Sequence, residues 1–262
     1  MDKASVSGVL VGIGGITAGL LIEGGNLGQV LQPTAAMIVF GGTFGAVLLQ
    51  FPLPVVLTAL RRLIHVFVEP KLQPGQMVMQ LVGYANQARK NGIVSLDAET
   101  AKIEDPFLKK SLMLAVDGTE PQELRKIMEL ELDNIGERDE QVPKVFESAG
   151  GFSPTIGIIG AVLGLIQVMQ HLQNIDEVGR GIAVAFVATI YGVGAANLFF
   201  LPTAGKLKLR MREEQVIREM TLEGVISILE GMNPRMLETK LLGYLHETEK
   251  DEGQASEKEP ES

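Results

Sequence analysis

Residues 151–206 read GFSPTIGIIGAVLGLIQVMQHLQNIDEVGRGIAVAFVATIYGVGAANLFFLPTAGK. Two apolar runs within this stretch, 154–172 and 181–201, hold no Asp, Glu, Lys or Arg. As a helix, a run of about 20 residues crosses the roughly 30 Å hydrocarbon core of a bilayer. A soluble helix of that length needs a polar face, which both runs lack. The stretch therefore predicts a transmembrane helical hairpin.

Two further apolar runs, 4–22 and 34–51, predict two more spans. The first run has no strong basic stretch before it, so we expect a retained span and not a cleaved signal peptide. Glycines four residues apart lie on one helix face and let helix backbones approach closely in lipid. Such pairs recur in these spans: Gly8 with Gly12, Gly15 with Gly19, and Gly41 with Gly45.

The distribution of basic residues predicts the topology. They gather after the second and fourth spans: Arg61, Arg62, Lys206, Lys208, Arg210 and Arg212. Connectors 23–33 and 172–180 hold a single basic residue, Arg180. Because positive residues stay on the cytoplasmic side, both termini are predicted to be cytoplasmic. The expected fold is an all-α polytopic membrane protein, with spans at 4–22, 34–51, 154–172 and 181–201.

The remaining segments are polar. Residues 61–150 predict a helical cytoplasmic domain, and 204–246 predict further cytoplasmic helices. Proline fits the first turn of a helix, so helix starts are expected at Pro74, Pro106 and Pro121. Residues 247–262 are acidic and almost free of apolar side chains, which predicts a disordered tail.

Several function classes are disfavoured by composition. The net charge of −9 argues against a nucleic-acid partner, because phosphate binding needs a cationic surface. There is no cysteine, and the three histidines lie far apart. No catalytic spacing, phosphate loop or metal-ligand motif occurs. We therefore predict no enzyme activity, no cofactor and no metal site.

The spans contain hydroxyls, amides and a phenol, but no central ionisable group. A protein that moves protons by itself needs such a group near the middle of the membrane. Either this chain transports nothing, or another subunit brings the ionisable residue. The simplest interpretation of Thr189 is structural, with its hydroxyl hydrogen-bonded to the backbone of its own helix. Pro154 and Pro202 are interpreted either as helix punctuation or as flexible points that couple the spans to the cytoplasmic helices.

Three segments resemble the MotA/PomA branch of the MotA–TolQ–ExbB family, the stator proteins of the bacterial flagellar motor. FSPTIGIIGAVLGLIQVM is similar to the family's third span, and AVAFVATIYGVGAANLFFLPTAGKL to its fourth. YANQARKNGIVSLDAE resembles the cytoplasmic segment with an Arg-Lys pair and an acidic residue. The resemblance covers residues 4–245.

The resemblance implies a homopentamer in the bacterial inner membrane. Its five subunits would surround two transmembrane helices of a MotB-type partner, which is anchored to peptidoglycan and carries the ion-binding aspartate. Ion flow would then turn the rotor protein FliG through the cytoplasmic domain.

Residue roles follow from the resemblance by position. Pro154 and Pro202 match two functional prolines, which we expect to couple ion flow to movement. Thr189 matches a threonine that faces the ion pathway, where we also expect Tyr191. Ala161 stands where sodium-driven relatives tend to carry threonine. A dehydrated sodium ion needs oxygen ligands, so Ala161 favours protons over sodium.

The rotor contact is expected at Arg89, Lys90 and Asp97. The first two match basic rotor-contacting residues, and Asp97 stands where the family usually has glutamate. Ala98 and Thr100 stand where sodium-driven relatives carry further acidic residues, so the charge pattern of this contact differs from theirs.

The main alternative is a TolQ/ExbB-type energiser of a periplasm-spanning partner. Relatives of the TolQ/ExbB type resemble proteins with three membrane spans, so the four spans predicted for this chain favour the stator. The lack of a charge within the spans disfavours a self-contained transporter. The segment with Arg89 and Asp97 and the paired prolines disfavour a passive scaffold.

Overall fold

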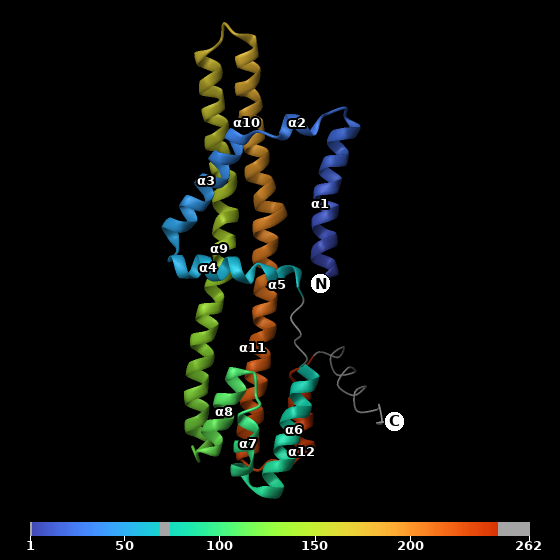
Figure 1. The fold of residues 1–262 in the computed structure, drawn as a ribbon, viewed down its shortest axis with the longest axis vertical. Helices are drawn as coiled ribbons and strands as arrows, with labels where there is room; N and C mark the ends of the chain where they lie inside the picture. Colours follow the sequence, from blue (N-terminus) through green and yellow to red (C-terminus); the bar gives the residue numbers. More distant parts are fainter. Residues whose placement is uncertain (1, 69–73, 246–262) are drawn as a thin grey trace. The chain divides into compact units, whose positions relative to one another are not determined.

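The computed structural model describes residues 2–68 and 74–245, and every regular element in these ranges is a helix (Figure 1). The predicted all-α class is confirmed. The chain divides into two compact units: unit 1 draws on residues 1–70 and 139–209, and unit 2 on 71–138 and 210–262. The predicted disordered tail lies outside the described residues.

Unit 1 contains the apolar helices. Its elements are α1 (Lys3–Ile22), α2 (Leu27–Val30), α3 (Pro33–Gln50), α4 (Leu53–Arg62), α5 (Ile64–Phe67), α10 (Ile175–Ala195), the π-helix η2 (Ala196–Phe200) and parts of α9 (Pro121–Gln170) and α11 (Leu201–Leu229). Within residues 2–68 and 74–245, four helices are long and apolar enough to cross a membrane: α1, α3, α9 and the continuous run Ile175–Leu229. The prediction of four long apolar helices is confirmed.

The third and fourth spans belong to helices much longer than a bilayer requires. α9 has 50 residues and encloses both Pro143 and Pro154. α10, η2 and α11 follow one another without a break, so Pro202 also lies within a continuous helical run. The interpretation of Pro154 and Pro202 as helix punctuation is therefore wrong. Each proline lacks an N–H, so the helix loses one i→i−4 hydrogen bond at that point.

Unit 2 is a helical domain with its own core. Its elements are α6 (Pro74–Asn91), the 3₁₀-helix η1 (Ile93–Leu96), α7 (Asp97–Thr100), α8 (Pro106–Val116), α12 (Pro234–Leu242) and the remaining parts of α9 and α11. The helix starts expected at Pro74, Pro106 and Pro121 are confirmed. Asp105 caps α8 by accepting a hydrogen bond from the Leu108 N–H at 2.8 Å.

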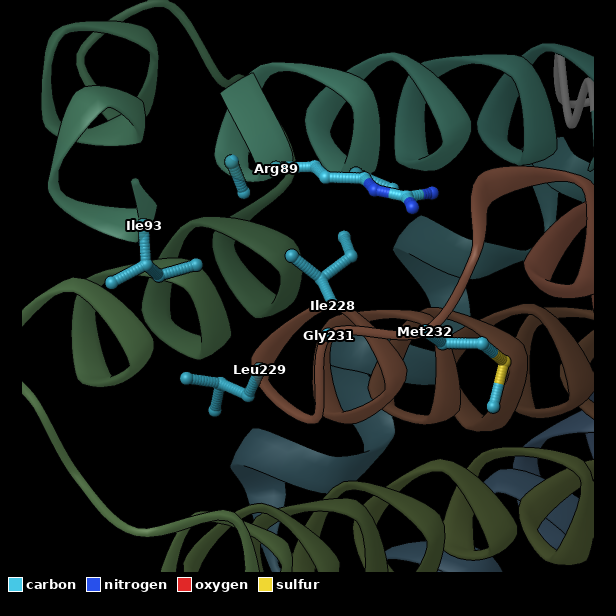
Figure 2. Close-up of a pocket in the computed structure, with 8 residues that line it drawn as sticks. Arg89, Ile93, Ile228, Leu229, Gly231 and Met232 are labelled. Carbon is cyan, nitrogen blue, oxygen red and sulfur yellow. The ribbon is translucent and has the colours of Figure 1, made fainter. Parts of the chain in front are cut away.

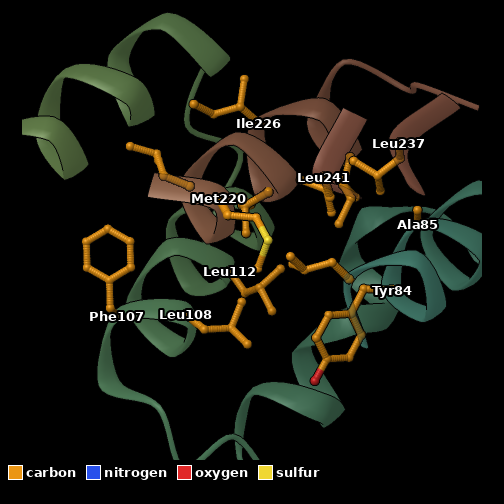
Figure 3. Packing of buried hydrophobic residues seen from close by; sticks show 14 of the residues in the cluster. Tyr84, Ala85, Phe107, Leu108, Leu112, Met220, Ile226, Leu237 and Leu241 are labelled. Carbon is orange, nitrogen blue, oxygen red and sulfur yellow. The ribbon is translucent and has the colours of Figure 1, made fainter. Parts of the chain in front are cut away.

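Large apolar side chains hold these helices together. Figure 3 shows Leu108 and Leu112 of α8 facing Met220 of α11, with Leu237 and Leu241 of α12 beside them. All five side chains are almost fully buried. Burying one such side chain contributes about 1.5–3 kcal/mol, so this cluster is the main source of stability for unit 2.

One ion-pair network joins three helices of unit 2. The Arg125 Nη2 of α9 lies 2.8 Å from the Glu223 Oε2 of α11, and Lys240 of α12 donates to the other carboxylate oxygen of Glu223. Burial raises the pKa of Glu223, but the hydrogen bonds from Lys240 and Arg125 outweigh burial and lower that pKa from its usual 4.5. The network therefore stabilises the charged carboxylate.

We expect Glu223→Gln to lower the free energy of unfolding of unit 2 by about 1.5–3 kcal/mol, because charge-assisted hydrogen bonds are lost. A carboxylate with a lowered pKa contributes its stability in full above pH 4.5 and loses it as the pH falls through the folded pKa. The wild type should thus lose stability below pH 4.5 more steeply than the variant. Hydrogen exchange of α11 and α12 in the whole protein measures this. Glu213→Gln, at an exposed site of α11, is the control.

Candidate functional site

α9 and α10 pack backbone against backbone through glycines. A Cβ added at Gly192 would lie 2.5 Å from the Ser153 carbonyl oxygen, and one at Gly164 would lie 2.7 Å from the Gly181 carbonyl oxygen. A Cβ at Gly157 would lie 2.9 Å from the Ala188 carbonyl oxygen. Small residues at such contacts let helices approach closely in lipid. The hairpin predicted from residues 151–206 is thus a tightly packed pair.

The glycine pairs of the first two spans do not make such contacts within this chain. A Cβ at Gly8, Gly15 or Gly19 would meet nothing within 4 Å. The same holds for Gly41 and Gly45. Among these motif glycines Gly12 alone has a close neighbour, a Leu198 methyl group 3.3 Å from an added Cβ, so the backbone-to-backbone packing in one chain occurs in the hairpin.

Ser153 adds a hydrogen bond between the two helices, and sequence reasoning missed it. Its side chain is fully buried, and its Oγ donates to the Gly192 carbonyl at 2.9 Å. A buried hydroxyl needs a partner, and here the partner lies 39 residues away in the sequence. The only sequence signal was a serine directly before Pro154 at the edge of an apolar run.

Thr189 lies on α10 next to the glycine contact, half-buried. Its Oγ1 donates to the Ala185 carbonyl at 3.2 Å. The expected hydrogen bond to its own helix is therefore confirmed. The hydroxyl oxygen keeps lone pairs that accept hydrogen bonds, so its role in the ion pathway stays a prediction.

Tyr191 ties α10 to the connector between α2 and α3. Its hydroxyl donates to the Val30 carbonyl at 2.6 Å and accepts from the Gln32 N–H at 3.2 Å, and its ring stacks on Phe40 with ring centroids 6.0 Å apart. These contacts give Tyr191 a structural role. Its place in the ion pathway stays a prediction, as does that of Ala161, which is half-buried on α9.

The two predicted coupling prolines occupy different surroundings. Pro154 packs against α10, because a Cβ at Gly192 would lie 3.2 Å from the Pro154 Cα. Pro202 is exposed and lies two residues after the end of the π-helix η2. π-helices are rare and are frequently found at functional sites. The fourth span therefore has two local irregularities close together at its C-terminal end, the π-helix η2 and Pro202.

The predicted rotor contact lies at one corner of unit 2. Arg89 and Lys90 form the last turn of α6, where cations are favoured by the helix dipole. A turn at Gly92, with φ of 81°, leads into η1 and α7, which begins at Asp97. The side chains of Arg89, Lys90 and Asp97 are exposed and form no ion pair within residues 2–68 and 74–245.

A small apolar cavity of about 210 Å³ lies beside Arg89. Figure 2 shows the Arg89 side chain extending toward Met232, with Ile93 and Leu229 at the opposite side. The corner therefore combines exposed charges, which form no ion pair within the described residues, with a small recess beside Arg89.

Comparison with known proteins identifies relatives along almost the whole chain. A family model described as motility protein A N-terminal matches residues 6–92, and one described as MotA/TolQ/ExbB proton channel family matches residues 99–220. Motility protein A of Bacillus subtilis is 35% identical over 246 residues, which cover 94% of this chain and 91% of that protein.

Two solved structures share the fold. The structure of C. jejuni MotAB matches with a TM-score of 0.89 at 30% identity, covering 94% of this chain and 97% of that chain. The flagellar MotAB stator complex from Bacillus subtilis matches with a TM-score of 0.86 at 33% identity, covering 95% and 99%. Proteins of this family and fold are ion channel subunits and not enzymes. This chain therefore belongs to the MotA/TolQ/ExbB proton channel family, as a membrane-embedded flagellar stator subunit of the motility protein A type.

Proposed function

We propose that this stator subunit conducts protons together with a MotB-type partner and uses the flow to turn the rotor protein FliG. One observation carries the proposal. The close-packed hairpin contains no Asp, Glu, Lys or Arg in residues 154–172 or 181–201. Proton movement through a membrane needs an ionisable group, so a partner must supply it. Solved relatives that are complexes of MotA with MotB support such a partner.

The proposed assembly is a ring of five subunits in the inner membrane, around the transmembrane helices of the peptidoglycan-anchored partner. Large apolar side chains on the outer faces of the hairpin support it, among them Ile158 (58% exposed) and Phe186 (69% exposed). Among the described residues of a single chain nothing covers these faces, whereas lipid, a neighbouring copy or the partner would. The basic residues after the second and fourth spans support cytoplasmic termini.

The proposed ion is H⁺, with sodium as the disfavoured alternative. Ala161 presents a methyl group where a sodium site would use a hydroxyl oxygen. Thr189, which keeps an acceptor oxygen, is proposed to face the path. A match to the motility protein A N-terminal model over residues 6–92 favours the stator over the TolQ/ExbB-type energiser.

A strain that lacks this gene tests the proposal. We expect flagellated but paralysed cells, whose swimming the restored gene rescues with or without sodium and a proton uncoupler abolishes. Rescue that requires sodium would overturn the choice of ion. Normal swimming together with an envelope or uptake defect would move the protein to the TolQ/ExbB side.

We propose that Arg89, Lys90 and Asp97 contact FliG. Asp97→Arg is expected to reduce torque strongly without loss of assembly, because Asp97 is exposed and nothing in the described residues depends on its charge. Stall torque of tethered cells and recovery of the stator complex from membranes are the two measurements.

Asp117→Arg is the matched control, since it makes the same change of charge at an exposed position after α8. Equal loss of torque in both variants would argue for a general charge effect. Normal torque in Asp97→Arg would remove Asp97 from the rotor contact.

A further inference from the structure

Asp2 is a buried carboxylate at which three segments of unit 1 meet. Its side chain belongs to the few charged ones that are buried, with 4% of the residue exposed. Its Oδ1 accepts from the Ser5 N–H at 3.0 Å and so caps α1, while its Oδ2 lies 2.6 Å from the Lys206 Nζ of α11. Its own N–H donates to the Phe67 carbonyl at the end of α5, at 2.8 Å. One residue therefore connects α1, α5 and α11.

Lys206 lies on α11, shortly after the end of the fourth span. It is the first ionised side chain after the apolar run 181–201. It follows Pro202 by four residues, so both lie on the same face of the helix. The missing N–H of Pro202 removes the i→i−4 hydrogen bond to the Leu198 carbonyl, and η2 ends two residues before Pro202. The ion pair thus holds the helix just beyond the point at which its regular backbone hydrogen bonding is interrupted.

α1 has little else to hold it to the rest of the chain. None of its residues is buried. Its middle approaches the fourth span at Gly12, where an added Cβ would lie 3.3 Å from a methyl group of Leu198. The position of the N-terminal end of α1 therefore depends on the contacts of Asp2.

We infer that Asp2 and Lys206 are positioning residues for rotation. Their ion pair holds the part of α11 that follows Pro202 against α1 and α5, so that this part keeps its place when the helix bends at Pro202. This inference rests on the proposed ion-driven rotation. A buried charge that loses its partner is costly, so the two residues also contribute to stability, and the test must separate the two effects.

The chain offers a matched control two residues further along. Lys208 pairs with Glu147 at 2.5 Å, but the side chains of this pair are 55% and 39% exposed, whereas that of Asp2 is 5% exposed. Exposed ion pairs contribute little. Lys206→Gln and Lys208→Gln therefore remove the same charge from the same helix. In one case the partner is the buried carboxylate of Asp2, with Lys206 itself 31% exposed, and in the other case both side chains are exposed.

Asp2→Asn separates the ion pair from the helix cap, because asparagine also caps helices well. The double variant Asp2→Asn with Lys206→Gln leaves no unpaired charge. We expect Lys206→Gln to lower the melting temperature of the purified complex by on the order of 10 °C and to abolish swimming. The double variant should recover most of the melting temperature and still not swim. Lys206→Arg, which keeps the charge, and Lys208→Gln should both swim.

A distance measurement does not depend on motility. The chain has no cysteine, so spin labels on cysteines at the exposed positions Ser7 and Leu209 report on α1 and α11 alone. Labelled chains are diluted with unlabelled copies, so that only pairs within one chain contribute. We expect Lys206→Gln to lengthen or broaden this distance, and Lys208→Gln to leave it unchanged.

An unchanged distance in Lys206→Gln, or full swimming of the double variant, would overturn the inference. If the wild-type gene does not restore swimming, the proposed function fails, while the distance measurement still decides whether the ion pair positions α11 against α1.

Discussion

Gly192→Val is expected to abolish stator function, with the largest structural effect of any single substitution considered. Its Cβ would lie 2.5 Å from the Ser153 carbonyl oxygen, 3.1 Å from the Gly157 Cα and 3.2 Å from the Pro154 Cα. All three atoms belong to the backbone, so no side-chain rotation relieves the overlap. Overpacking of side chains alone costs about 1–3 kcal/mol, and here α9 and α10 must separate.

Separation of the two helices would also break the hydrogen bond from Ser153 to the Gly192 carbonyl. The measurements are the amount of protein in membranes, the melting temperature of the solubilised complex and swimming. All three should fall.

Gly194→Val is the control for Gly192→Val. It lies two residues further along α10, and a Cβ there would meet nothing within 4 Å. We expect this variant to be present in membranes at the wild-type level. If Gly192→Val is as stable as Gly194→Val, the backbone contact between the two helices does not hold the hairpin together.

Pro154→Leu is expected to abolish rotation while the protein inserts and assembles. Leucine restores an N–H that donates to the Gly150 carbonyl, and it is favoured over proline inside a helix by up to about 3 kcal/mol. The melting temperature should therefore stay the same or rise. Loss of swimming at unchanged or higher stability is the result that separates a coupling role from a structural one.

Pro143 provides the comparison, because it lies inside the same helix. Pro154→Ala should resemble Pro154→Leu, whereas Pro143→Ala should keep swimming. Loss of assembly in Pro154→Leu would instead mean that the ring of this proline is needed for packing against α10.

Much of the fold follows from local patterns in the sequence. The charge-free runs near 154–172 and 181–201 locate the hairpin, because a helix without a polar face needs lipid or protein around it. Pro74, Pro106 and Pro121 mark helix starts, since proline fits the first turn.

The same proline rule fails at Pro154 and Pro202. A proline at a helix start and one inside a helix look alike in sequence, and packing against neighbouring helices decides whether the lost hydrogen bond is tolerated. Glycine spacing is equally ambiguous, because Gly15 and Gly19 match the motif as well as Gly160 and Gly164 do, but an added Cβ at Gly15 or Gly19 would meet nothing within 4 Å in this chain.

Contacts between residues far apart in sequence were missed altogether. The Tyr191 hydroxyl donates to the Val30 carbonyl over 161 positions, and Asp2 pairs with Lys206, which lies in α11 near the other end of unit 1 in sequence. Each partner is an ordinary residue in its local setting. Only the arrangement of helices brings them together.

The π-helix at Ala196–Phe200 makes the length of the fourth span a constraint in its own right. One wide turn adds a residue to the helix, and each residue turns an α-helix by about 100°. A single deletion within this turn that restores regular winding would therefore leave Pro202 and Lys206 on their present faces, whereas a deletion elsewhere in α10 would rotate both by about 100°. Chimeras between relatives should therefore keep the wide turn together with its extra residue, or replace both by regular α-helix that is one residue shorter, even where every side chain is exchanged.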